Sequence, residues 1–235
     1  MADPDTWTVL PHGPIEQLEP NLWRVQGTLP NMPLKRVMVV AALSTGTLVV
    51  YSPIALDDAE MTALDALGPV GFIVVPNGMH RLDAKKFASR YPKARMLGPA
   101  GARGKIAKVV EVAALSELPA DPAVTLSEVA GTRDREAMMT VVSAARRSMV
   151  FADAIFNMPH LSGLKGFVLQ HLTKSSGGPR VSRLAKLLLI SDKRAFAAQL
   201  DQLASPDLVR VIVGHHEMIT DRPADALRDI AATLR

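Results

Sequence analysis

The chain has 235 residues, of which 48% are hydrophobic and 4% aromatic, and its formal net charge is +4. This composition is typical of a globular protein with a sizeable core and excludes a disordered chain. Cysteine is absent, which excludes disulfides, cysteine nucleophiles and thiolate metal sites, so any metal must be held by His, Asp, Glu or Asn. The mild charge and the few aromatic side chains do not indicate a partner nucleic acid. No signal peptide and no apolar run of about 20 residues is visible, so we expect a cytoplasmic protein without a transmembrane segment.

The first half of the chain alternates strand-like and helical patterns. Two apolar runs separated by Ser44-Thr45-Gly46 predict a β-hairpin. Asp57 is a suitable N-cap for a helix that Gly68 and Pro69 end. The predicted strands cover residues 22–29, 36–43, 47–54, 70–77, 94–99 and 109–115, and the predicted helices cover residues 57–67 and 83–91.

After Pro122 the pattern becomes that of an antiparallel meander. Its three strand-like runs cover residues 124–131, 136–144 and 148–156. A helix capped by Asp192, a strand over residues 208–217 and a final helix starting at Pro223 follow. Because strands come in two groups that each have helices, we expect one α/β domain over residues 1–235, built as a four-layer αββα sandwich. The alternative is a three-layer α/β fold.

Polar side chains gather where three apolar strands end. Asn77, His80 and Asp83 follow the first, Asp153 follows the second, and His215-His216-Glu217 follow the third. Imidazole and carboxylate groups suit zinc, iron or manganese. Each residue alone is more often structural, and a tandem His pair normally directs one ring at most into a given site. Together they predict a shared pocket at one edge of the sheets.

Residues 164–190 carry an excess of positive charge, with no acidic residue before Asp192. The segment is either a solvated cover or a basic lid that attracts an anionic substrate or a membrane surface. We expect Leu164–Arg183 to lie near the mouth of the pocket and to be more mobile than the sheets. His160 and His171 could approach the pocket from this segment.

The order of elements resembles the metallo-β-lactamase fold over most of the chain. In that superfamily one strand enters a His-x-His-x-Asp-His loop, and later strands end in Gly-His, Gly-Asp and Gly-His. VVPNGMHRLD, VAGTRD, VFADAIF and VIVGHHE stand at these places here. The chain is most similar to a subfamily described as a domain of unknown function, which shares Tyr51-Ser52-Pro53 and Pro76-Asn77 followed by His80.

Several positions depart from the superfamily's metal motif. The first loop retains only His80 and Asp83, Thr132 stands where a histidine is expected, and Ala152 replaces a glycine before Asp153. A two-metal site needs about five or six protein ligands, and this chain offers fewer. The resemblance therefore implies either one zinc or iron ion held by His80, Asp153 and His215, or a pocket without metal.

Two functions are compatible with this reduced site. One is a hydrolase-like protein for a small-molecule ester, amide or phosphoester, in which a metal ion activates water and Asp153, the expected catalytic residue, helps to position it. The alternative is a non-catalytic protein that binds a small ligand. Both require that His80, Asp153 and His215 converge, with Asn77 in the same wall of the pocket.

Overall fold

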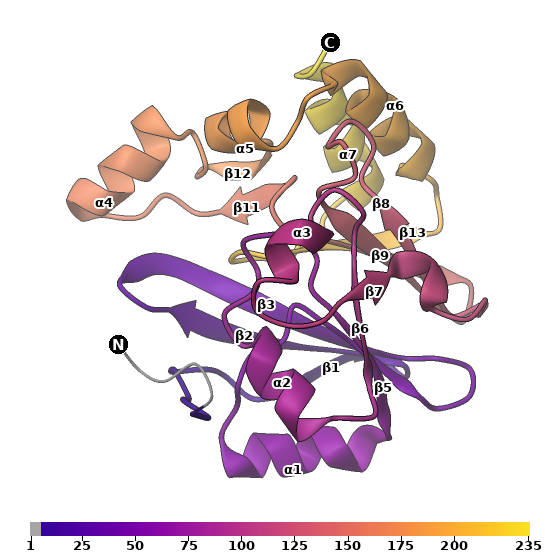
Figure 1. Cartoon of the computed structure of the whole chain (residues 1–235). Helices are drawn as coiled ribbons and strands as arrows, with labels where there is room; N and C mark the ends of the chain where they lie inside the picture. The colour runs from indigo at the N-terminus through magenta and orange to yellow at the C-terminus, as the bar shows by residue number, and fades with distance from the viewer. Residues whose placement is uncertain (1–5) are drawn as a thin grey trace.

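The computed structural model describes residues 6–235, apart from the side chains of Pro33, Leu164 and Lys165. Two sheets face each other at the centre of the molecule (Figure 1). The larger sheet has the order β1-β2-β3-β4-β5-β6-β7. Its strands are Glu16–Glu19, Leu22–Leu29, Met32–Ala42, Leu48–Tyr51, Val70–Val74, Arg95–Gly98 and Ala113–Ala114.

The smaller sheet has the order β13-β10-β9-β8. In chain order its strands are β8 (Val124–Glu128), β9 (Ala137–Ser143), β10 (Arg146–Phe151) and β13 (Leu208–Val213). A two-stranded ribbon pairs β11 (Phe156–Met158) with β12 (Gly178–Arg180). The predicted hairpin and the antiparallel meander are confirmed, since β3 pairs antiparallel with β4, and β9 pairs antiparallel with both β8 and β10.

Helices cover the outer face of each sheet, which gives the four predicted layers (Figure 1). α1 (Asp58–Leu67) and α2 (Ala84–Arg90) pack on the larger sheet, and α6 (Lys193–Leu203) and α7 (Pro223–Ala232) pack on the smaller one. The predicted caps are present, because the carboxylates of Asp57 and Asp192 accept the N–H groups of Glu60 and Ala195. Shorter elements are α3 (Arg103–Ile106), α4 (Gly163–Phe167), α5 (Arg183–Leu188), the 3₁₀ turn Leu115–Glu117 and the π-helical turn Val168–Leu172.

The core between the sheets holds the strand centres that the sequence predicts to be buried. Val39, Val49 and Val74 of the larger sheet pack there against Met139, Val150 and Ile212 of the smaller one. The strand centres of the larger sheet are apolar at successive positions because this sheet is buried on both faces. In β3, for example, Val37 and Val39 face the central core whereas Met38 and Val40 face α1 and α2.

Several predicted strands are shorter in the structure than the sequence pattern indicates. The runs over residues 47–54, 70–77, 124–131 and 208–217 each end three or four residues early, the run over residues 109–115 forms only the two-residue strand β7, and the run over residues 148–156 stops at Phe151. This last strand stops because the N–H groups of Ala152, Asp153 and Ala154 all bond to the side-chain oxygens of Glu136. The buried side chain of Glu136 thus replaces the hydrogen bonds of the sheet ladder, and the strand ends just before Asp153. No helix of the described residues is long and apolar enough to cross a membrane.

Candidate metal centre

The pairing of two neighbouring strands brings Asp153 and His215 together. β10 and β13 are parallel, with Phe151 opposite Val213. The residues two positions further along, Asp153 and His215, therefore leave the same edge of the sheet side by side.

Gly214 permits the close approach of these two strand ends. Its N–H donates to the carbonyl oxygen of Ala152 at 3.1 Å. A Cβ at position 214 would lie 2.6 Å from that oxygen and 3.0 Å from Cε1 of His80. Any side chain there would push the strands or the His80 ring apart.

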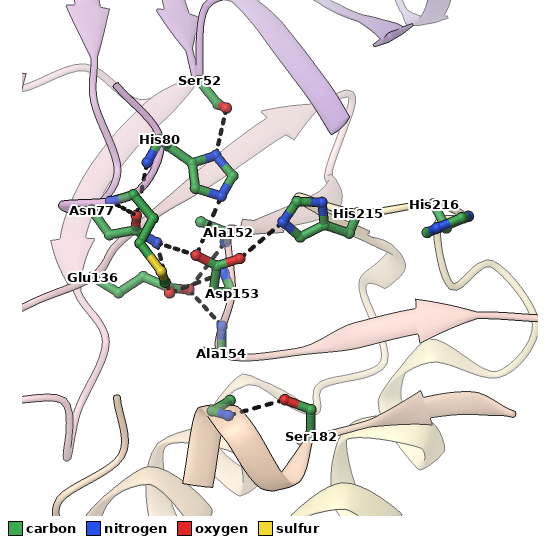
Figure 2. Close-up of polar contacts among 12 residues, drawn as sticks. Ser52, Asn77, His80, Glu136, Ala152, Asp153, Ala154, Ser182, His215 and His216 are labelled. Carbon is green, nitrogen blue, oxygen red and sulfur yellow. Dashed lines mark hydrogen bonds and ion pairs between the residues drawn. The ribbon is translucent and has the colours of Figure 1, made fainter. Parts of the chain in front are cut away.

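His80 comes from the larger sheet, in the loop between β5 and α2. The side-chain oxygen of Asn77 accepts the N–H groups of Met79 (2.8 Å) and His80 (3.1 Å), a local turn that Asn favours. The hydroxyl of Ser52 forms a 2.8 Å hydrogen bond with Nδ1 of His80. Together these contacts fix the ring with Nε2 directed toward the smaller sheet (Figure 2).

The carboxylate of Asp153 lies between the two imidazoles (Figure 2). Its Oδ1 is 3.0 Å from Nε2 of His215, and its Oδ2 is 3.3 Å from Nε2 of His80. The ligand atoms of the three residues all lie within 4.8 Å of one another, and the two ring centroids are 5.4 Å apart. The predicted convergence is confirmed, and Asn77 lies in the same wall, where its amide donates to Oδ2 of Asp153 at 2.7 Å.

Electrostatics at the cluster favour charge separation between Asp153 and His215. Burial alone would raise the pKa of the Asp153 carboxyl, but the charges and hydrogen bonds of His80 and His215 lower it well below its usual range. Burial alone would lower the pKa of His215, but its hydrogen bond to Asp153 and the charge of that carboxylate raise it. Asp153 is therefore an ionised carboxylate at neutral pH, as a metal ligand must be.

Each imidazole is held on the side that faces away from Asp153. Nδ1 of His215 donates to the carbonyl oxygen of Lys35 at 2.8 Å, and the ring of Phe156 stacks on it with the planes 15° apart. The hydroxyl of Ser52 likewise forms a hydrogen bond with Nδ1 of His80. Such outer hydrogen bonds fix the tautomer and orientation of a metal-ligating histidine.

Glu136 supports the cluster through the backbone, and the sequence pattern does not identify it. It is fully buried directly before β9, and its two oxygens accept the three N–H groups of residues 152–154, each at 3.0 Å. Burial and the negative charge of Asp153 raise its pKa to about 8. The pair thus carries its negative charge on Asp153. One signal in the sequence was available: an acidic residue directly preceding the apolar run AMMTVV.

Other predicted polar residues lie outside the cluster. Asp83 instead forms a buried ion pair with Arg36 at 2.6 Å and a second one with Lys86 at 2.8 Å, so it anchors α2 to β3. His216 points away from His215 (Figure 2), and burial lowers its pKa to about 4. Thr132 bonds to the carbonyl oxygen of Val129.

The two histidines of the basic segment make local contacts. Nδ1 of His160 lies 3.0 Å from the hydroxyl of Ser176, and the ring of His171 packs on Phe167 with centroids 4.5 Å apart. Neither residue lines the pocket above the cluster. Of the predicted segment Leu164–Arg183, Ser182 near its C-terminal end lines the pocket.

A pocket of about 300 Å³ opens above the cluster. His80, Asp153 and His215 form its polar floor together with Ser52. Its walls are largely apolar and come from the β2–β3 hairpin, the loop after β5, Phe156 and α5. The apolar lining residues are Leu29, Met32, Leu34, Pro53, Met79, Leu82, Phe156, Leu184, Ala185, Leu188 and Leu189.

The donor set fits one metal ion. Two imidazoles and one carboxylate with an open side toward the pocket match mononuclear zinc sites and two-histidine, one-carboxylate iron sites. Among residues 6–235 no other group of three such side chains lies close enough together to hold an ion. The nearby oxygens of Asn77, Glu136 and Asp83 are occupied by backbone or cationic groups.

Comparisons with known proteins identify the fold. The sequence matches no family model and no curated protein. Solved structures of metallo-β-lactamases match over nearly the whole chain. The DIM-1 enzyme exposed to ceftazidime has a TM-score of 0.64 at 9% identity, covering 97% of this chain and 100% of that one.

Two further structures agree with this match. The FIM-1 enzyme from Pseudomonas aeruginosa in its mono-zinc form has a TM-score of 0.60 at 10% identity, covering 97% of this chain and 98% of that one. The enzyme from Erythrobacter litoralis has a TM-score of 0.59 at 13% identity, covering 93% and 96%. The chain therefore has the metallo-β-lactamase fold.

Proposed function

We propose that this protein is a hydrolase that uses one divalent ion, held by His80, Asp153 and His215, to cleave an ester, amide or phosphoester bond of a small, largely apolar molecule. The observation that carries the proposal is the convergence of these three ligand atoms within 4.8 Å at the floor of an apolar pocket. That one solved structure with this fold is a mono-zinc form is consistent with a single-ion site.

The bound ion would supply Lewis-acid polarisation of the carbonyl or phosphoryl oxygen. Residues of the chain orient the two imidazole rings and the carboxylate of Asp153. Ser52 and the carbonyl of Lys35 hold the two rings from behind, and Asn77 holds Oδ2 of Asp153. Preorganised groups of this kind need no rearrangement when the reaction occurs.

Asp153 is the residue that we assign to positioning the attacking water. The two imidazoles hold its pKa low, so at neutral pH it is a charged group whose oxygens accept hydrogen bonds. Glu136 fixes the backbone on both sides of it, which keeps the carboxylate aimed at the pocket. Glu136 is a positioning residue because it acts through Asp153.

The apolar walls determine which molecules enter. Leu34, Phe156 and Leu189 surround the floor with hydrocarbon, which favours an apolar substrate body. Excluding water from the floor also strengthens each electrostatic interaction there.

The test combines metal content with turnover. Protein purified without a histidine tag should contain one zinc or iron ion per chain. It should hydrolyse p-nitrophenyl esters or phosphodiesters in a reaction that chelator abolishes. His80→Ala/His215→Ala should lose both the ion and the reaction, whereas the matched variant His160→Ala/His171→Ala should keep both. Turnover that survives chelator or the first double variant would overturn the proposal.

A second function, metal-free binding of a small ligand, is favoured by one observation. Both Nε2 atoms already have Asp153 as a partner, so the floor is satisfied without an ion. In that case the purified protein would hold no metal and would bind apolar esters without cleaving them. Calorimetry with an uncleaved ester in the presence of chelator separates the two functions.

A further inference from the structure

The large apolar side chains that remain exposed concentrate around the mouth of the pocket. In residues 6–235, five of the exposed ones line it and come from three separate elements. Leu187 of α5 lies beside them and is 80% exposed. We name this surface the apolar rim, and it consists of Met32, Met79, Leu82, Leu184, Leu187 and Leu188.

The side chains of the apolar rim lie together around one pocket mouth and are not scattered singly over the surface. Most soluble proteins bury such side chains or expose them singly, and a contiguous exposed patch marks an interaction surface. Phe167 and Leu172, both more than half exposed, lie on α4 and the π-helical turn after it. Figure 1 places α4 and α5 on the same side of the molecule as the β2–β3 hairpin.

Basic side chains without acidic partners accompany the rim. From Ala154 to Ser191 the chain has five Lys or Arg residues and no Asp or Glu. In the part of the chain whose side chains are described, Lys174, Lys186 and Lys193 form no ion pair. Lys186 lies in α5 between Leu184 and Leu187 of the rim, and its ammonium donates to the carbonyl oxygen of Thr233 at 3.5 Å. Burial and the charges of Lys193 and Lys174 lower the pKa of Lys186. The side chain of Lys165 lies outside the described residues.

We propose that the apolar rim and the Lys174–Lys186–Lys193 cluster dock the protein onto the surface of an anionic phospholipid bilayer. Apolar side chains inserted at the interface and lysines facing lipid phosphates are the two features that peripheral membrane binding requires. The pocket opens within the rim, so docking would place its mouth at the acyl-chain boundary.

A second copy of this chain is a poorer occupant of the same surface. A symmetric dimer would bring the same patch of both copies together, and the two lysine clusters would then repel each other. Nucleic acid is also a poorer occupant, because leucine and methionine offer no stacking platform for bases. Docking onto the bilayer would require neither a bound metal ion nor catalysis.

Vesicle sedimentation tests the proposal with chelator present throughout. The protein should sediment with phosphatidylcholine vesicles that contain phosphatidylglycerol, and at least tenfold less with phosphatidylcholine alone. High salt should weaken the binding, because screening reduces the attraction between lysine and lipid. Equal or absent sedimentation with both vesicles would overturn the proposal.

Matched variants assign the binding to this surface. Leu184→Asn/Leu187→Asn/Leu188→Asn and Lys174→Glu/Lys186→Glu should each reduce binding at least tenfold. The controls Val142→Asn and Lys93→Glu, both at exposed positions away from the rim, should not. Sedimentation velocity provides the second readout: a dimer that the leucine variant dissolves would assign the rim to a second copy and overturn the proposal.

Discussion

The floor and the rim of the pocket differ in exposure and in polarity. At the floor, Asp153 and His215 are buried, and the side chain of His80 is 7% exposed. The ring nitrogens of both histidines and the oxygens of Asp153 all have hydrogen-bond or ion-pair partners. At the rim, Leu184, Leu187 and Leu188 are more than half exposed. The floor is fixed by strand register and buried hydrogen bonds, whereas the rim is carried by a hairpin, a loop and a six-residue helix.

We therefore expect the floor to contribute mainly to the stability of the fold and the rim to contribute mainly to binding. A substitution at the floor removes contacts that the fold itself needs, so it should change the free energy of unfolding. A substitution at the rim removes side chains that contact mostly solvent, so it should change binding and leave the fold intact.

Glu136→Ala should give the largest effect. It removes the acceptor for three buried N–H groups, and each unsatisfied donor costs about 1–3 kcal/mol. We expect a loss of roughly 3 kcal/mol or more in the free energy of unfolding, measured by urea denaturation. Glu136→Gln keeps an acceptor oxygen and should lose clearly less. Equal losses for the two variants would contradict the assigned role.

Zinc should stabilise the protein by binding to His80, Asp153 and His215 at the floor of the pocket and at no other site. An ion that binds only the folded state at about 100 times its dissociation constant adds roughly 2.7 kcal/mol, which appears as a rise in the melting temperature. Chelator should reverse the rise, and His80→Ala/His215→Ala should remove it. The matched pair His160→Ala/His171→Ala should leave it unchanged. A zinc-dependent rise that persists without His80 and His215 would place the ion elsewhere.

Gly214→Ala should disturb both the fold and the floor. The new Cβ would lie 2.6 Å from a backbone oxygen and 3.0 Å from the His80 ring. Overpacking of this kind costs about 1–3 kcal/mol, and zinc affinity should fall because His80 is displaced. The control Gly104→Ala has no atom within 4 Å of the added Cβ and lies in α3, so it should be neutral or slightly stabilising. A Gly214→Ala protein with unchanged stability would show that the strand ends can separate freely.

Leu187→Ser should have the smallest effect on stability. The side chain is 80% exposed, so the free energy of unfolding should change by less than about 0.5 kcal/mol. Leu200→Ala is the contrasting change, because Leu200 lies on the buried face of α6 and its truncation should cost about 2–5 kcal/mol. If Leu187→Ser were as costly as Leu200→Ala, the separation between rim and floor would be wrong.

The sequence predicted the features that local patterns encode. The apolar runs, which come in two groups along the chain, indicated the two sheets, and Asp57 and Asp192 indicated helix caps. The residues at three strand ends indicated His80, Asp153 and His215 because strand ends on one edge must meet. The expectation that at most one of His215 and His216 faces the site is confirmed.

The sequence did not predict the features that depend on long-range contacts. Glu136 reaches residues 152–154 across the sheet, and its place directly before an apolar run does not indicate those contacts. Asp83 is retained with His80 in the loop that resembles the metal motif, but Arg36 of β3 forms an ion pair with it instead. The apolar rim also depends on three elements that only the fold brings together. The mobility of Leu164–Arg183 stays a prediction.

Anomalous X-ray diffraction at the zinc absorption edge tests the central claim most directly. Crystals grown with zinc should show one ion bound by Nε2 of His80, Nε2 of His215 and an oxygen of Asp153, at about 2.0–2.2 Å from each. The carboxylate would then have exchanged its contacts with the two rings for the ion, while Ser52 and Lys35 keep theirs with Nδ1. Imidazoles that stay hydrogen-bonded to Asp153 with saturating zinc present, and no anomalous peak between them, would contradict the account.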